Sequence, residues 1–378
     1  GDSLYSLAGA MLRTPRDITD ALTEWTPGSM TDDGTNNGEN YIFLSAGYGA
    51  GNTDEFALEV KTTRNSDSQL ELTTLGQDTN TVNVQLSRIG DSVIALYQLL
   101  GEEWQVHRRY SRPDMPETMQ VGLVTYTDWE KASDFDPFTQ NSTVLTPGVA
   151  GDPTPGEAFN PDLTAGFEYA RYALPDVPEA LAGADLNDPA SVSDAELLSF
   201  LGDNTNRIDD GETGGGEGEG EPQPTAVPIP GLSDEFEDAA SITDWLRVNE
   251  TEGWNADQLQ TFDVDQTQEG RLTMVPHTTV WFENYRGPLA YKTVSGDFAF
   301  TTRVNISDRD DIGGSDADSV PGDVLRPDGT LEHGPHHIAP VCQHFGQCGG
   351  CQLQHADEDA LRQFVTERVT FQAEKHDF

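Results

Sequence analysis

The chain has 378 residues, 35% of them hydrophobic, which is enough to bury the core of one large domain or two smaller ones. Its formal net charge of −45 at pH 7 argues against nucleic-acid binding by the main body, because phosphate contacts need clustered Lys and Arg. Acid-rich, lysine-poor surfaces suit media in which counterions screen self-repulsion, so we expect an extracellular or secreted protein, with a saline habitat as one option. No run of about eighteen apolar residues occurs in the sequence, which predicts that no segment spans a membrane.

The first part of the chain predicts antiparallel strands. Short runs alternate apolar and polar residues and are bounded by turn sequences such as NNG, GQD and IGD. These runs cover 40–47, 55–63, 68–75, 80–90, 92–99, 103–110 and 119–127. A helical pattern follows in SVSDAELLSFLG, and the alternating runs as a whole are typical of an all-β fold.

A segment rich in Gly, Glu and Pro, residues 208–230, predicts a flexible acidic linker. Strand-length runs resume at 270–277, 279–285, 289–294 and 297–306, and a helical pattern appears again at 357–375. We therefore expect two β-blocks at 1–150 and 231–307, an extension with a short helix at 151–207, linkers at 208–230 and 308–329, and a Cys-rich tail at 330–378.

The two β-blocks resemble the two halves of one known type of domain. DEFEDAASITDWLRVNE and the stretch from GRLTMVPH to TTRV resemble the opening half of a concanavalin A-like sandwich of the laminin-G or glucanase type, and the first block resembles its closing half. The halves stand in reversed order, and Gly-Asp follows Pro321 just as Gly-Asp opens the chain. The resemblance implies an all-β jelly-roll sandwich, circularly permuted and sharing one core, plus a short, partly helical C-terminal tail. Two truncated neighbouring domains are the alternative.

Glycosidases of this superfamily carry two glutamates and an aspartate along one strand, in an E-x-D-x-x-E or closely related arrangement. No such string occurs here. The acidic clusters at 234–238 and 102–103 lie at a domain start and in a predicted turn, where solvated acids are common. We assign no catalytic residue and expect that the chain is not an enzyme.

Two aromatic clusters are candidates for ligand binding, because sugar rings stack on flat aromatic faces while polar side chains bind hydroxyl groups. The candidate residues are Trp281, Tyr285, Arg286 and Tyr291 in one cluster, and Trp104, Arg108 and Tyr110 in the other. Ordinary core aromatics are the alternative. In the strand pattern, His107 and Arg109 point away from the face of Arg108 and Tyr110.

The stretch GADLNDPASVSDAELLSFLG faintly resembles a calcium loop followed by a helix, with Asp185 and Asn187 as oxygen ligands. Pro189 occupies the next ligand position, however, and a helix capped by Ser193 explains the same residues without a metal ion. Calcium is therefore the less favoured of the two interpretations.

The tail contains all three cysteines, so disulfides cannot hold the main fold together. Cys342, Cys348 and Cys351 lie in HHIAPVCQHFGQCGGCQLQH, which is similar to the iron–sulfur segment of the class I RNA uracil-C5 methyltransferases. That resemblance implies a [4Fe–4S] cluster held by a fourth, later cysteine, which this sequence does not contain. His344 or His355 could instead complete a zinc site. We expect a fragment without a filled metal site.

Taken together, these patterns predict a non-catalytic carbohydrate- or surface-binding β-sandwich of a secreted protein, with no resident cofactor. Its expected partner is a polysaccharide or cell-surface glycan. Two alternatives are a fragment of an iron–sulfur RNA uracil-C5 methyltransferase, supported by the tail, and a structural adhesion module.

Overall fold

The computed structural model describes residues 3–16, 38–52, 55–76, 79–202, 227–309, 324–325 and 331–332. The chain divides into two compact units, residues 1–312 and 313–378. In the second unit, the described residues form two short antiparallel strands, β16 (Val324–Leu325) and β17 (Leu331–Glu332). All other described elements belong to the first unit.

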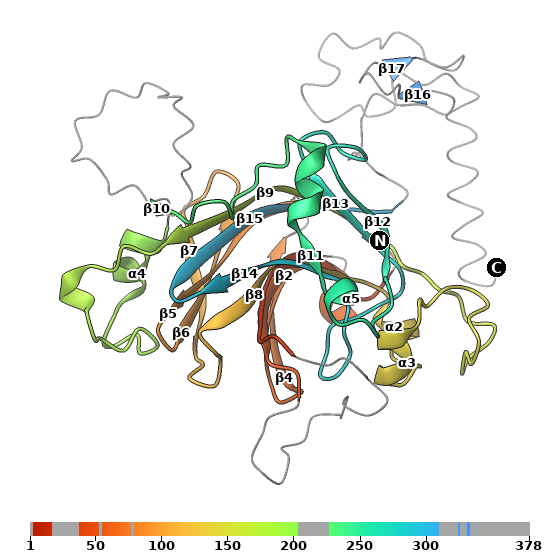
Figure 1. Cartoon of the computed structure of the whole chain (residues 1–378), viewed down its shortest axis with the longest axis horizontal. Coiled ribbons are helices and arrows are strands. Elements are labelled where there is room, and N and C mark those ends of the chain that lie inside the picture. Colours follow the sequence, from red (N-terminus) through yellow and green to blue (C-terminus); the bar gives the residue numbers. More distant parts are fainter. Residues whose placement is uncertain are drawn as a thin grey trace. The chain divides into compact units, whose positions relative to one another are not determined.

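The first unit is a sandwich of two antiparallel sheets, so the expected all-β class is confirmed (Figure 1). The 7-stranded sheet has the order β11 (Leu246–Arg247), β14 (Leu289–Ser295), β8 (Thr118–Tyr126), β1 (Ser6–Arg13), β2 (Tyr41–Tyr48), β3 (Phe56–Arg64) and β4 (Asp67–Gly76). The 8-stranded sheet has the order β12 (Leu259–Val264), β13 (Leu272–Pro276), β9 (Thr164–Leu174), β15 (Phe298–Ser307), β5 (Thr81–Ile89), β6 (Ser92–Leu99) and β7 (Gln105–Ser111), with β10 (Val227–Pro228) paired to β9.

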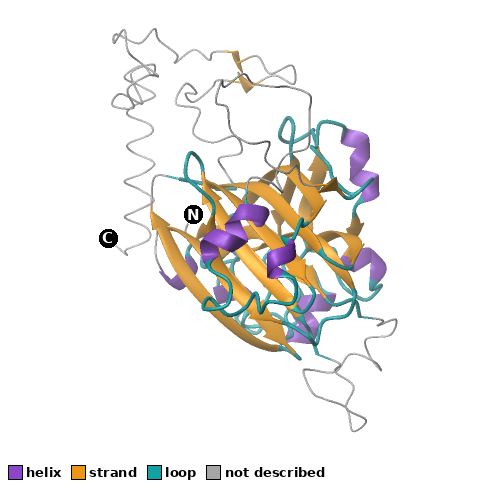
Figure 2. Ribbon diagram, turned by 90° about the vertical axis from the view of Figure 1, so that its left-hand side faces the viewer, coloured by secondary structure: helices purple, strands orange, loops and turns teal. Residues whose placement is uncertain are grey.

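Short helices occupy the connections between the strands (Figure 2). They are η1 (Ala50–Asn52), α2 (Trp129–Ala132), α3 (Pro137–Ser142), η2 (Glu179–Leu181), α4 (Asp194–Leu201), η4 (Ala239–Asp244) and α5 (Val248–Thr251). Helix α4 is the helix expected from the sequence, and Ser193 and Glu196 form its capping box. None of the described helices combines the length and hydropathy needed to cross a bilayer.

Both faces of the 7-stranded sheet are buried, as β1 illustrates. Because side chains alternate along a strand, Ala8, Ala10 and Leu12 point into the core between the sheets, while Leu7 and Met11 point to the opposite face. All eight residues of β1 are buried. We call the face that carries Leu7 and Met11 the outer face of the 7-stranded sheet.

The two β-blocks share one hydrophobic core, as expected from the sequence. Ala8, Ala10 and Leu12 of the first block lie in the same buried cluster as Phe298 and Phe300 of the second. The strands also interleave, because β14 pairs with β8, and β15 pairs with β5.

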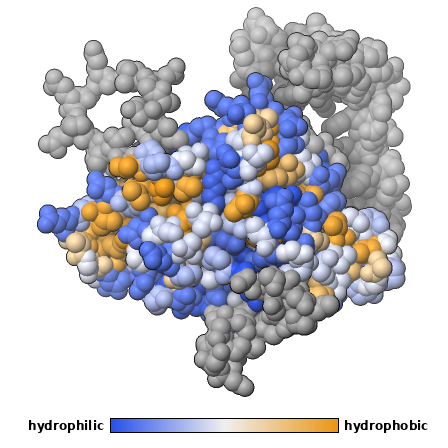
Figure 3. Space-filling view, viewed as in Figure 1, coloured by the Kyte–Doolittle hydropathy of each residue, from blue (hydrophilic) through white to orange (hydrophobic). Residues whose placement is uncertain are grey.

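Two details differ from the expectation. The segment 279–285 forms isolated bridges instead of a strand, pairing Thr279 with Thr127. The extension 151–207 contributes β9, which lies between β13 and β15 in the middle of its sheet. The expected tail helix at 357–375 lies outside the described residues. Figure 3 shows hydrophilic side chains covering much of one face of the molecule, with smaller hydrophobic patches between them.

Candidate functional site

The outer face of the 7-stranded sheet is covered by connecting segments. Its apolar cluster joins strand residues such as Phe43 and Tyr126 to Ala132, Val248 and Trp281 from the cover. Two polar features lie between sheet and cover: a buried network of arginines and glutamates, and a cavity. We consider them in turn.

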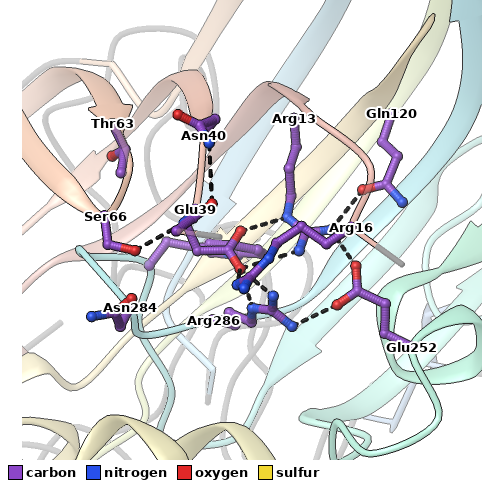
Figure 4. Close-up of polar contacts among 12 residues, drawn as sticks. Arg13, Arg16, Glu39, Asn40, Thr63, Ser66, Gln120, Glu252, Asn284 and Arg286 are labelled. Carbon is purple, nitrogen blue, oxygen red and sulfur yellow. Dashed lines mark hydrogen bonds and ion pairs between the residues drawn. The ribbon is translucent and has the colours of Figure 1, made fainter. Parts of the chain in front are cut away.

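The network contains three arginines and two glutamates (Figure 4). Arg13 Nε donates to Glu39 Oε2 at 2.8 Å, and Arg13 Nη1 donates to Glu252 Oε1 at 2.6 Å. Arg16 Nη1 lies 2.6 Å from Glu39 Oε1, and Arg286 Nη1 donates to Glu252 Oε2 at 2.5 Å. Arg286 also pairs with Glu39. The network thus ties β1 to the segments that carry Glu252 and Arg286.

The arginines keep both carboxylates of the network ionised. Burial alone would raise the pKa of Glu39, but Arg13, Arg286 and Arg16 hold it well below its usual value. The same balance of burial against Arg13 and Arg286 lowers the pKa of Glu252. Because every one of these side chains is nearly or fully buried, the network serves primarily to fasten the cover to the sheet.

The cavity has a volume of about 180 Å³ and lies beside β3. Glu59 and Lys61 are two residues apart on that strand, so both side chains point to the outer face. Five aromatic residues line it: Tyr5, Tyr126, Trp129, Trp281 and Phe282. Leu70, whose side chain is 40% exposed, also lines the cavity and places part of its wall at the surface.

Glu59 and Lys61 form a buried ion pair, with Lys61 Nζ 2.7 Å from Glu59 Oε1. The ammonium also donates to the Trp281 carbonyl oxygen at 2.7 Å and lies 4.5 Å from the centre of the Phe43 ring. Burial lowers the pKa of Lys61, and Glu59 opposes that shift. Burial, and then the Glu59 charge, raise the pKa of the Tyr126 hydroxyl well above its usual value. The Glu59 carboxylate is completely buried and lies against Lys61 and the Tyr126 hydroxyl.

The structure places the first predicted cluster on this outer face. Trp281 is fully buried and its Nε1 donates to the Pro288 carbonyl oxygen at 3.1 Å. The Tyr285 hydroxyl donates to a backbone carbonyl at 2.8 Å, and the Tyr291 hydroxyl lies 3.0 Å from Thr251 Oγ1. Arg286 belongs to the ion network. Of these four residues, only Trp281 lines the cavity.

The second predicted cluster lies on the other sheet. Trp104 is buried in the apolar cluster formed with α4, Arg108 pairs with Glu71 at the surface, and Tyr110 packs against the central core. Arg109 instead faces the segment around α4 and donates to the Val192 carbonyl oxygen at 2.6 Å. The structure therefore does not bring the two clusters together into one site.

Of the proposed metal ligands, Asp185 and Asn187 lie in the part of the chain that the structure describes. Asp185 Oδ1 accepts a hydrogen bond from the Asn187 backbone at 3.0 Å, an arrangement typical of a turn. Within the described part of the chain, no three His, Cys, Asp or Glu side chains converge on a metal position. Cys342, Cys348 and Cys351 lie outside the described residues.

The sequence analysis missed Glu59 and Lys61. Their signal is present in EFALEVKTT, where two charged residues alternate with apolar ones on a strand. On a sheet with one solvated face, such charges point to water. Here the cover buries them.

Comparisons with known proteins concern a short part of the chain. No family model matches, and no solved structure matches. Part of the chain is similar to RNA methyltransferases. An uncharacterized RNA methyltransferase of Zymomonas mobilis is 57% identical over 51 residues, which is 14% of this chain and 13% of that protein. A second, from Caulobacter vibrioides, is 38% identical over 63 residues, or 14% of this chain and 15% of the relative.

A third relative carries a more specific name. The 23S rRNA (uracil(1939)-C(5))-methyltransferase RlmD of Marinomonas posidonica is 48% identical over 33 residues, which is 9% of this chain and 8% of that protein. The chain therefore spans 15% or less of the length of these three relatives.

These matches correct the functional expectations from the sequence. A carbohydrate-binding role in a secreted protein, with a polysaccharide or glycan partner, is not supported, because the matched relatives are named as RNA-modifying proteins. The expectations that the chain is not an enzyme and has no nucleic-acid partner are corrected for the same reason. The matched stretches cover 14% of the chain or less in each case.

Proposed function

We propose that the Cys-rich tail, residues 330–378, is a segment of an iron–sulfur RNA uracil-C5 methyltransferase and acts in RNA modification. The observation that carries the proposal is the 57% identity over 51 residues to an RNA methyltransferase. We place this match on the tail and the few residues before it, within 322–378, because the residues that resemble the methyltransferases lie there.

The donor set of the tail suits an iron–sulfur cluster. Cys342, Cys348 and Cys351 supply three thiolates within ten residues, and thiolates are the ligands that hold such clusters. A [4Fe–4S] cluster needs a fourth ligand. Six of the eight histidines of the chain lie in the tail. His344 lies between Cys342 and Cys348, and His355 follows Cys351, so both are close enough in sequence to serve as the fourth ligand. When bound, the cluster would supply a rigid, redox-active anchor for this segment.

For the sandwich, we propose the finer fold expected from the sequence, a concanavalin A-like jelly roll with its halves permuted. Support comes from the positions of the two ends of the sandwich. Ser3 Oγ lies 3.2 Å from Thr127 Oγ1, which accepts a hydrogen bond from the Asp162 backbone N–H at 3.2 Å. Asp162 Oδ1 in turn accepts from the Arg309 backbone N–H at 3.2 Å. Both ends thus contact the same neighbourhood, as a permuted chain requires.

Anaerobic reconstitution of the full chain with iron and sulfide tests the proposed function. We expect about four irons per chain, with visible thiolate-to-iron absorption, and loss of both in a Cys348→Ser, Cys351→Ser double variant. His107→Ala, in the sandwich, serves as the control and should keep the iron. Binding of a uracil-containing 23S rRNA fragment, measured by fluorescence anisotropy, should weaken in the double variant. Absence of iron, together with equal RNA affinity of the parent chain and the double cysteine variant, would contradict the proposal.

A further inference from the structure

The cavity beside β3 has a buried floor and a mouth at the surface. Apart from the ion pair, the floor consists of side chains that are at most 2% exposed: Tyr126, Val280 and Trp281. The mouth consists of apolar side chains that are partly exposed: Tyr5, Leu70, Trp129 and Phe282. The cavity therefore opens to the surface between side chains that are mostly aromatic, an arrangement typical of small-molecule sites.

Backbone hydrogen bonds hold the mouth in place. The Trp129 backbone N–H donates to the Leu4 carbonyl oxygen at 3.1 Å. The Glu283 backbone N–H donates to Ser68 Oγ of β4 at 2.8 Å. Each of these bonds fixes a residue of the mouth or a direct neighbour of one. A mouth that is already formed loses little conformational entropy when a ligand binds.

The backbone around the mouth adopts left-handed conformations that are uncommon for residues other than glycine. Tyr5, which lines the cavity, has a φ of 58°. Asp128, just before Trp129, has a φ of 66°. Glu283, just after Phe282, has a φ of 51°. Such conformations persist where the surrounding structure imposes them, and they cluster at sites that hold ligands.

We propose that this cavity binds a small, uncharged molecule built on one aromatic ring. A cavity of about 150 Å³ accommodates benzene, so about 180 Å³ suits one six-membered ring with a small substituent. The rings of Trp129 and Phe282 have centroids 5.3 Å apart at an interplanar angle of 77°, so they form an aromatic corner. A ligand ring in this corner gains stacking and edge contacts beyond the burial of its apolar area.

The buried ion pair favours an uncharged aromatic ring over other ligands. Glu59 and Lys61 neutralise each other, with 2.7 Å between Oε1 and Nζ, so a charged ligand would lose its water among apolar walls without a counter-charge of its own. The Lys61 ammonium lies 5.3 Å from the centre of the Phe282 ring and 5.5 Å from that of Tyr126. An ammonium group among aromatic faces favours a further aromatic ring over an aliphatic one. This inference concerns the sandwich alone and does not depend on the function proposed for the tail.

Titration of the full chain with toluene, followed by tryptophan fluorescence and calorimetry, tests the proposal. Methylcyclohexane is the matched ligand, because it has the same carbon skeleton without an aromatic ring. We expect toluene to bind about fivefold more tightly or better. Benzoate and benzylammonium carry the same ring with a charge, and each should bind about tenfold more weakly than toluene or worse.

Two variants locate the site. Leu70→Trp adds bulk at the mouth and should abolish toluene binding, whereas Leu100→Trp, at another exposed leucine, should leave it unchanged. Thermal unfolding verifies that both variants are folded, and the comparison of ligands on the unchanged chain depends on neither. Methylcyclohexane binding as tightly as toluene would overturn the proposal, as would tighter binding of benzoate or benzylammonium. Toluene binding that persists in Leu70→Trp, or no toluene binding at all, would overturn it as well.

Discussion

Arg13 and Glu39 form an ion pair in which both side chains are completely buried, with 2.8 Å between Nε and Oε2. Arg13 is the last residue of β1, in the middle of the 7-stranded sheet. Glu39 lies just before β2, which begins at Tyr41. Through Glu252 and Arg286, the pair extends to the segments that cover the sheet. The cover is therefore attached by charge as well as by apolar packing.

Glu39→Gln should destabilise the sandwich strongly. Removing one partner of a buried ion pair leaves the other charge without compensation, which costs about 3–5 kcal/mol. Here Arg13, Arg16 and Arg286 all lose their common partner. Glu71→Gln, which breaks the exposed pair with Arg108, is the matched control and should cost at most about 1 kcal/mol. Urea unfolding measures both, and equal losses would show that the buried network is not a major source of stability.

Stability should fall in acid because of the same network. The pKa values of Glu39 and Glu252 are lower in the folded protein than the ordinary value of 4.5, so their ionised forms favour folding. This contribution is complete above pH 4.5 and is lost as the pH falls through the lowered pKa values. We expect the free energy of unfolding to decline below about pH 4.5. The decline should be shallower in Glu39→Gln, and parallel pH profiles of variant and parent would contradict this origin.

Local sequence pattern anticipated most strands because alternation and turn residues are local properties. Tyr41–Tyr48 and Phe56–Arg64 lie where the alternating runs predicted them. Strand β9 was not predicted, because it pairs with β13 and β15, and its paired residues Phe167 and Ala173 are followed only much later in the chain by their partners Leu272 and Ala299. The run 279–285 has strand composition, but its residues close the outer face, and Trp281 is buried there.

The candidate site was harder to anticipate, because it depends on which face of the sheet is covered. A sandwich predicted from alternation buries one face of each sheet, so Glu59 and Lys61 would have been assigned to solvent. Their burial comes from segments distant in sequence: Lys61 Nζ donates to the Trp281 carbonyl oxygen and lies 5.3 Å from the centre of the Phe282 ring. Arg286 was predicted to bind a ligand, whereas in the structure its guanidinium group forms ion pairs with Glu39 and Glu252.

Gly122→Ala should be destabilising although the backbone of Gly122 lies in a regular strand. A Cβ atom there would lie 2.0 Å from the Ala290 carbonyl oxygen and 2.6 Å from the Tyr291 Cα atom of β14, so one of the two strands must move. We expect a loss of about 3 kcal/mol. Gly166→Ala, in β9, is the control, because its Cβ would meet side-chain atoms only, the amide end of Gln268 and Cδ of Arg271, and flexible side chains can move aside. Its loss should be about 1 kcal/mol. A larger loss for Gly166→Ala in urea unfolding would contradict this distinction.

The sandwich should fold when its two blocks are placed in the opposite order. In the rearranged chain, residues 227–321 come first and residue 321 is joined to Gly1, so that the chain ends at 207. Ser3 and Arg309 both reach the neighbourhood of Thr127 and Asp162, so the new junction connects ends that already lie near each other. All strand pairings are kept, and moving a connection between close ends changes stability by only about 1–2 kcal/mol. Urea unfolding of the rearranged chain and of residues 1–321 in the original order measures the difference in stability.

A control permutant that opens the chain between Gly122 and Leu123 interrupts β8. Because β8 pairs with β1 on one side and β14 on the other, this control should not fold. If both permutants are unfolded, the sandwich depends on its present chain order and the proposed permutation is wrong.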